Sequence, residues 1–194
     1  MKIILASQSP RRRELLERMG VTEFEVRPAQ GEERVDPNLT PAQLVEQLSV
    51  QKAREIAAQE PEALVIAADT VVAVDDKVLG KPADRQDAVE MLTQLSGRSH
   101  RVYTGVTVCR GAEERTEHEA TEVVFCSLTP EQIQAYVDTL EPMDKAGSYG
   151  IQGRGCVLVE GIRGDYYNVV GLPVCRLAQM LRQFGVEPLT RPGE

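Results

Sequence analysis

Three consecutive arginines follow a serine and a proline near the start of the chain. In this segment, Ser-Gln-Ser-Pro-Arg-Arg-Arg, Ser9 can cap a helix and Pro10 suits its first position. Free backbone N–H groups at a helix start attract anions. Arg11, Arg12 and Arg13 would oppose the helix dipole unless something negative binds there. The pattern favours an anion-binding helix start, and the alternative is a solvated basic turn.

An aspartate, Asp69, follows five apolar residues at 64–68. An apolar run of this length predicts a strand that is buried on both faces. A carboxylate at its end needs a partner, because burying an unpaired charge costs several kcal/mol. We therefore expect Asp69 at a strand tip that faces a cleft, a metal or a cation. The alternative is an aspartate that only begins a turn.

Other charged residues could complete such a site. Glu32 and Glu33 lie in an acidic loop and, with Asp69, could converge on a hard divalent cation such as Mg²⁺ or Mn²⁺. Lys52 lies on a predicted helix, and Lys81 precedes a predicted turn. A solvated loop and surface lysines are the alternatives for these residues.

A glycine-rich segment at 143–155 must form a shaped loop. It has neither the GK[ST] of a Walker A loop nor a GxGxxG after a strand, which argues against a motor or a GTPase-type switch. Glycines allow the backbone to approach a base or ribose closely, although a tight connection explains the same pattern. The helix start, the aspartate, the lysines and this loop together suit a nucleotide bound through its phosphates with a divalent metal and hydrolysed by water.

The elements that would position these groups alternate between strand and helix patterns, which predicts a mixed α/β fold. Capping patterns predict helices that begin at Pro10, Pro41, Arg85, Pro130 and Pro173. Strands are predicted at residues 3–6, 24–27, 64–69, 101–108, 117–125, 156–159 and 161–163. A hairpin turn is predicted at Asp75-Asp76, and the tail after about residue 187 is expected to be frayed.

Composition narrows the class of protein. A chain of 194 residues fits one domain or two small lobes that share a core. The net charge of −8 argues against general binding to nucleic acid or to an anionic membrane. The apolar part of the N-terminus is too short for a signal peptide, and no stretch approaches a membrane span. These features predict a cytoplasmic protein.

Cysteines and histidines do not suggest a metal site of their own. Two histidines are too few and too isolated for a histidine metal site. The cysteines form no CxxC pair, so that neither a zinc module nor a disulfide framework is indicated. We expect buried, reduced thiols at Cys109, Cys126, Cys156 and Cys175.

Six segments occur in order: SQSPRRRELL, AADTVV, LGKP, LSGRSHRVYTGV, EPMDKAGSYGIQGRG and GDYYNVVGLP. Together they resemble the Maf family of nucleoside triphosphate pyrophosphatases, from Ile3 to about Phe184. The resemblance implies an inosine-triphosphatase-like α/β fold over residues 1–194, with two lobes and a central cleft across an elongated, twisted mixed sheet flanked by helices. It also implies metal-dependent hydrolysis between the α- and β-phosphates, which yields a nucleoside monophosphate and pyrophosphate.

The resemblance also assigns roles to residues. It makes Asp69 the proton acceptor, while metal ligation by Asp69 stays open. Arg11, Thr70 and Gln152 match the substrate-selecting positions of the branch that acts on dTTP and UTP. In the branch that acts on 7-methyl-GTP, an aromatic residue stands in place of Arg11, Gln in place of Thr70 and Glu in place of Gln152. Phosphate or metal contacts are implied for Ser7, Arg12, Glu33, Lys52 and Lys81. One departure is Gly31, where relatives often carry an apolar or acidic residue.

The first functional hypothesis is therefore a pyrophosphatase that hydrolyses dTTP and UTP with Mg²⁺ or Mn²⁺. The resemblance adds a house-cleaning role against unwanted nucleotides, a link to septum-formation arrest and a homodimer as expectations. The alternatives are a pyrophosphatase for 7-methyl-GTP or another modified nucleotide, and a non-catalytic regulator of septum formation that senses a nucleotide.

Overall fold

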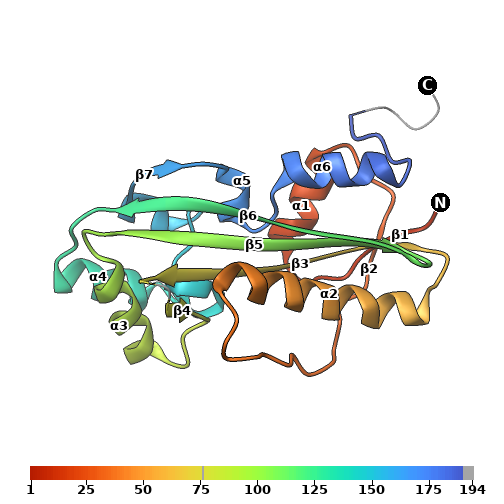
Figure 1. Cartoon of the computed structure of the whole chain (residues 1–194). Helices are drawn as coiled ribbons and strands as arrows, with labels where there is room; N and C mark the ends of the chain where they lie inside the picture. Colours follow the sequence, from red (N-terminus) through yellow and green to blue (C-terminus); the bar gives the residue numbers. More distant parts are fainter. Residues whose placement is uncertain (76, 190–194) are drawn as a thin grey trace. The chain divides into compact units, whose positions relative to one another are not determined.

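A computed structural model describes residues 1–75 and 77–189 (Figure 1). Its elements follow in the order β1 (Ile3–Leu5), α1 (Pro10–Arg18), β2 (Glu25–Val26), α2 (Pro41–Gln59), β3 (Leu64–Val74), β4 (Lys77–Leu79), α3 (Arg85–Leu95), β5 (Ser99–Arg110), β6 (Glu113–Phe125), α4 (Pro130–Asp138), β7 (Val159–Arg163), α5 (Tyr166–Val170) and α6 (Val174–Gln183). Short 3₁₀ helices span Glu141–Asp144, Ala146–Ser148 and Arg154–Leu158.

Strands and helices form the mixed α/β fold that the sequence predicts. The seven-stranded sheet has the order β2-β1-β3-β5-β6-β7, and β4 pairs with β3 at its side. Strand β1 is parallel to β2 and β3, whereas the pairs β3–β4 and β6–β7 are antiparallel. Among the described helices, none combines the length and the apolar character that crossing a bilayer requires.

Side chains cap most of the helices where the sequence predicts. Ser9, Thr40, Asp84 and Thr129 each accept a hydrogen bond from the backbone N–H three residues later. Thr40 and Thr129 form full capping boxes with a glutamine at the third helical position. These caps fix the starts of α1, α2, α3 and α4, and α2 and α1 carry candidate site residues.

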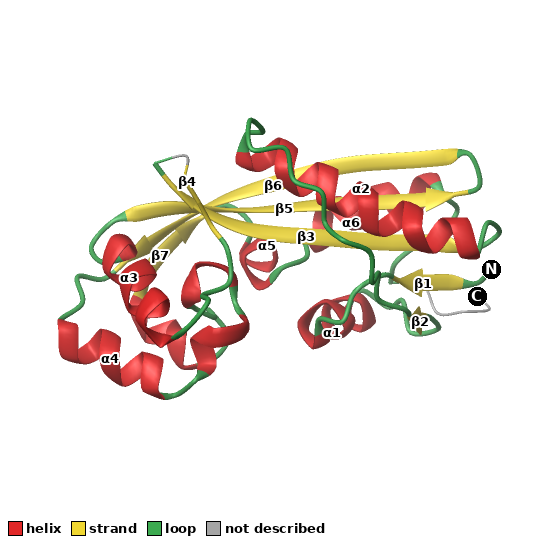
Figure 2. Cartoon of the chain, turned by 90° about the horizontal axis from the view of Figure 1, so that it is seen from below, coloured by secondary structure: helices red, strands yellow, loops and turns green. Residues whose placement is uncertain are grey.

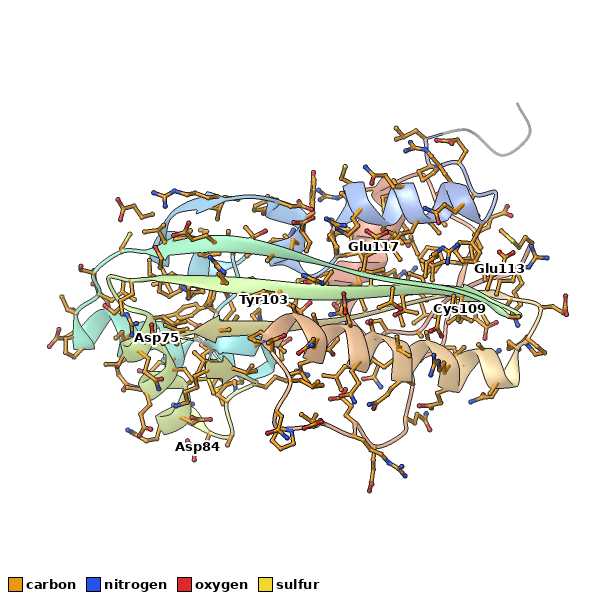
Figure 3. The ribbon with its side chains drawn as sticks, viewed as in Figure 1. Asp75, Asp84, Tyr103, Cys109, Glu113 and Glu117 are labelled. Atoms are coloured by element: carbon orange, nitrogen blue, oxygen red, sulfur yellow. The ribbon has the colours of Figure 1, made fainter. Side chains whose placement is uncertain are left out.

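The chain divides into two compact units. Strands β3, β5 and β6 each contribute residues to both units. The first unit comprises residues 1–69, 104–119 and the chain from Gly171 onward. Helix α2 covers one face of its strands, and α1 and α6 cover the other (Figure 1). A cluster of buried residues lies in this unit: Ile4, Ala6, Ala53, Ile56, Ala63, Val65, Ala67 and Cys109. Figure 3 shows Cys109 and Glu113 close to the turn between β5 and β6.

The second unit comprises residues 70–103 and 120–170. Helices α3 and α4 lie side by side in it (Figure 2). Its core combines aliphatic side chains of α3 and α4 with a ring cluster in which Phe125 packs edge-on against His100 and Tyr149. The His100 Nε2 and the Tyr149 hydroxyl share a hydrogen bond of 2.8 Å.

Several predictions about single elements need correction. Asp69 does not end its strand, because β3 continues through it to Val74 and pairs there with β4. The predicted strand at 156–159 is wrong, since a 3₁₀ helix covers most of it and one strand, β7, follows. Cys156 and Cys175 are exposed free thiols instead of buried ones, and Cys126 is half-buried.

The predicted hairpin between β3 and β4 is confirmed, with Asp75 in the left-handed region at a φ of 49°. Its second turn residue, Asp76, lies outside the described residues. At the C-terminus, the Leu189 N–H donates to the Met19 carbonyl at 3.0 Å. The rest of the tail that we expect to be frayed lies outside the described residues.

Candidate functional site

The start of α1 turns one of its three arginines inward. Arg12 Nε donates to the Gly171 carbonyl at 2.8 Å, and Nη1 donates to the Ala68 carbonyl at 2.8 Å and to Ser7 Oγ at 3.3 Å. Burial lowers the pKa of Arg12, and the charge of Asp69 counteracts this effect. Arginine nevertheless stays protonated in proteins. These acceptors hold a fixed positive charge beside the backbone that precedes Asp69.

The neighbouring arginines behave differently. Arg13 is exposed and pairs with Glu17 one turn later, at 3.0 Å between Nε and Oε1. The solvated alternative is therefore correct for Arg13. Arg11 is half-buried in the first turn of α1. Anion binding at this helix start stays a prediction.

Two of the predicted carboxylates meet the predicted lysine. The Lys52 ammonium on α2 donates a hydrogen bond to Asp69 Oδ1 and lies 2.8 Å from Glu33 Oε1. The side chains of Lys52 and Asp69 are only 19% and 14% exposed, so that the charges are largely withdrawn from water. The expectation that Asp69 faces a cation is met, although the cation is a lysine and the residue lies within a strand.

Helix α2 also holds the acidic loop on both sides of Glu33. Glu55 Oε1 and Oε2 accept from the N–H groups of Gln30 and Gly31 at 2.8 and 3.0 Å. Gln51 accepts from the Arg34 N–H at 3.0 Å and donates to its carbonyl at 2.7 Å.

Glu33 is the glutamate of this loop that reaches Lys52. It lies between the two anchored backbone segments, and its side chain is 49% exposed. A Cβ at Gly31 would come within 2.8 Å of Glu55 Oε2, so that glycine suits the close approach at the one position that departs from the family pattern.

The carboxylate pair suits a divalent metal that is shared with a substrate. Within residues 1–75 and 77–189, no group of three or more His, Cys, Asp or Glu side chains could hold a metal ion alone. Mg²⁺ in nucleotide enzymes is typically held by one or two carboxylates together with phosphate oxygens and water. Glu33 and Asp69, which already face one cation, fit that type of site.

The remaining predicted residues belong to the second unit. Thr70 follows Asp69 in β3, Lys81 follows β4, and Gln152 lies in the glycine-rich loop. Lys81 and Gln152 are exposed, and Thr70 is half-buried. The Gly147 N–H donates to the Gly80 carbonyl at 3.0 Å, which ties the glycine-rich loop to the residue before Lys81.

Sequence reasoning missed the residues that hold these loops. Glu55 and Gln51 bind the acidic loop, and Glu141 and Tyr136 bind the glycine-rich loop. Glu141 stands in one of the motif segments, but nothing in its spacing indicates that its partners are backbone groups. A local pattern cannot reveal such contacts, because both partners depend on the path of the loop.

Comparisons with known proteins agree with the sequence motifs. Residues 2–184 match the family described as Maf-like protein. A dTTP/UTP pyrophosphatase of Symbiobacterium thermophilum is 56% identical over 184 residues, which cover 95% of this chain and 94% of the relative. A dTTP/UTP pyrophosphatase of Moorella thermoacetica is 54% identical over 189 residues, which cover 96% of each protein.

Among solved structures, a HAM1 protein from Coxiella burnetii aligns with a TM-score of 0.53 at 16% sequence identity. The alignment covers 94% of this chain and 99% of that chain. A likeness at this level of identity concerns the fold, and it supports the expected inosine-triphosphatase-like architecture.

Proposed function

The chain belongs to the Maf family, and we propose that it is a nucleoside triphosphate pyrophosphatase that hydrolyses dTTP and UTP. The products are the nucleoside monophosphate and pyrophosphate. The observation that carries the proposal is the Lys52 ammonium, which lies between the carboxylates of Asp69 and Glu33. Arg12 binds the carbonyl of Ala68, the residue before Asp69. This arrangement offers a base, two possible metal ligands and fixed positive charge.

Each of these side chains has a role in the proposed reaction. Glu33 and Asp69 would hold a Mg²⁺ or Mn²⁺ ion, which, when bound, neutralises phosphate charge and lowers the pKa of water. Asp69 orients the attacking water and accepts its proton. Arg12 and Lys52 stabilise the negative charge that develops on the pyrophosphate leaving group. Ser7, which accepts a hydrogen bond from Arg12, helps to fix that guanidinium.

Further residues are proposed to determine the specificity for the nucleotide. Arg11, Thr70 and Gln152 match the family positions that select dTTP and UTP, and Lys81 would contact phosphate. The amide of Gln152 can both donate and accept a hydrogen bond, which suits the imide edge of thymine or uracil. We also propose a cytoplasmic homodimer with a house-cleaning role, supported by the family resemblance.

A nucleotide panel tests the function. Purified protein with Mg²⁺ or Mn²⁺ should release pyrophosphate, not phosphate, from dTTP and UTP, and slowly or not at all from 7-methyl-GTP. Asp69→Asn should lower the rate by about 10²–10⁴-fold, because it removes the proton acceptor. The control Asp138→Asn removes an exposed carboxylate that pairs with Arg85 and should leave the rate unchanged. Release of phosphate, faster turnover of 7-methyl-GTP, or no turnover of any nucleotide would contradict the proposal.

A further inference from the structure

The glycine-rich loop closes around the carboxylate of Glu141, a residue to which the proposed mechanism gives no role. Glu141 Oε2 accepts from the Arg154 N–H at 2.8 Å, and Oε1 accepts from the Gly155 N–H at 3.1 Å. The Tyr136 hydroxyl donates to the same Oε1 at 2.9 Å. One carboxylate thus receives three hydrogen bonds, two of them from the loop backbone.

Tyr136 extends this contact to the beginning of the loop. Its hydroxyl oxygen accepts from the Gly150 N–H at 3.1 Å while the same group donates to Glu141. The residue is 5% exposed, and burial raises the pKa of its phenol, so that the hydroxyl remains a donor at neutral pH. The phenol and the carboxylate together bind both ends of residues 150–155.

Glu141 stays ionised in this position. Burial tends to raise the pKa of Glu141, but the hydrogen bonds from Arg154, Gly155 and Tyr136 outweigh burial and lower it. Charge-assisted hydrogen bonds of this kind are stronger than neutral ones. The Lys145 ammonium also donates to the Glu141 carbonyl at 2.6 Å, which fixes the backbone that carries the carboxylate.

The glycines of the loop make room for these groups. A Cβ at Gly153 would come within 2.5 Å of the Glu141 carboxylate, and a Cβ at Gly150 within 2.6 Å of the Lys145 side chain. Gln152, between these two glycines, is exposed. The inner side of the loop is therefore filled by Glu141 and its neighbours, and the glutamine side chain is left on the outer side.

We propose that Glu141, supported by Tyr136, is a positioning residue that fixes the loop carrying Gln152 and thereby determines the selectivity for the base. The proposal rests on the function proposed above, in which Gln152 contacts the base. Glu141 itself touches neither substrate nor metal in this scheme. Its effect passes through the backbone of residues 150–155.

Glu141→Gln tests the proposal with little change of shape. The amide NH₂ would face backbone or hydroxyl donors, so that at least one of the three hydrogen bonds is lost. We expect the ratio of kcat/KM for dTTP over dCTP to fall by about tenfold to a hundredfold, since a displacement of an ångström in a positioned group has effects of that size. Amide exchange at Arg154 and Gly155 should become faster.

Two further variants and a control separate positioning from general damage. Gln152→Ala should lower the same ratio, and the double variant with Glu141→Gln should be no worse than Gln152→Ala alone. Tyr136→Phe, which removes only the hydroxyl, should lower the ratio in the same direction and keeps the test available if Glu141→Gln does not fold. Asp138→Asn, whose carboxylate bonds to Arg85 and Gln134, should leave the ratio unchanged.

The outcomes also distinguish this proposal from the proposed function. Absence of pyrophosphate release by the unaltered protein would refute the function. If the unaltered protein is active, three results would instead overturn the role of Glu141: equal losses on dTTP and dCTP, additive losses in the double variant, or unchanged amide exchange in the loop.

Discussion

Replacing Gly105 by alanine should force α2 away from β5. Gly105 is buried in β5, where a Cβ would lie 2.8 Å from the backbone nitrogen of Glu46 and still closer to the carbonyl of Val45. Real Cβ atoms essentially never approach another atom to less than 3.0 Å. The obstacles are backbone atoms of α2, which cannot rotate aside as the end of a side chain can. The helix itself must therefore shift.

The expected cost follows from this geometry. Overpacking a well-packed interior costs about 1–3 kcal/mol, and the upper end applies here because two backbone groups obstruct the new methyl group. For a chain of 194 residues, about 3 kcal/mol corresponds to a Tm about 6–12 °C lower. Pyrophosphate release should also fall, because the same helix carries Lys52 to Asp69 and Glu55 to the acidic loop.

Urea unfolding of Gly105→Ala beside Gly161→Ala measures the effect. A Cβ at Gly161 in β7 meets no atom within 4 Å, so that this control reports only the loss of backbone freedom in the unfolded chain. Such a change is expected to stabilise by about 0.4–1 kcal/mol or to be neutral. If the free energies of unfolding of Gly105→Ala and Gly161→Ala agree within about 0.5 kcal/mol, α2 does not approach β5 closely at Gly105 and the reasoning is refuted.

Two other perturbations test the acidic loop and the ring cluster. Glu55→Gln turns its amide NH₂ toward the N–H group of either Gln30 or Gly31, so that one of the two hydrogen bonds is lost. The Mn²⁺ concentration for half-maximal pyrophosphate release should rise several-fold, while the rate at saturating Mn²⁺ changes little. An unchanged Mn²⁺ dependence would contradict a role of this anchor. Burial lowers the pKa of His100 to about 4. Between pH 6.5 and pH 4 the unfolded chain therefore binds a proton that the folded chain does not bind. The free energy of unfolding falls as the pH falls through this range. His100→Gln should reduce the loss of urea stability between pH 7 and pH 4.5, and an equal loss would show that His100 titrates freely in the fold.

Helix positions could be predicted from the sequence because their signals are local. Ser9, Thr40, Asp84 and Thr129 cap helices through backbone groups three residues away, and those partners are visible in the sequence. The strand expected at 156–159 fails for the opposite reason. A 3₁₀ helix spans Arg154–Leu158, and its first two N–H groups donate to the Glu141 carboxylate, 13 and 14 residues earlier in the chain. A contact between residues so far apart leaves no local pattern.

In the candidate site, too, the local residue types could be predicted from the sequence, whereas the contacts between distant residues could not. The residue types at Asp69, Lys52 and Glu33 indicated charge chemistry, yet their meeting joins a strand, a helix and a loop that only the fold brings together. The length of the strand around Asp69 depends on its pairing with neighbouring strands, which composition does not record. Nor does the arginine run reveal that Arg12 turns inward while Arg13 pairs with Glu17 on the surface.

Two loops that carry proposed site residues are each held by hydrogen bonds from backbone N–H groups to a glutamate carboxylate. Glu55 binds the N–H groups before Glu33, and Glu141 binds the N–H groups after Gln152. Main-chain donors are present whatever side chain a loop position carries, proline excepted, and glycine at Gly31 and Gly153 leaves room for the carboxylates that accept from them. Gly31 therefore does not weaken the case for Glu33 as a metal ligand. Its N–H still reaches Glu55, and Glu33 still reaches Lys52 and, through it, Asp69.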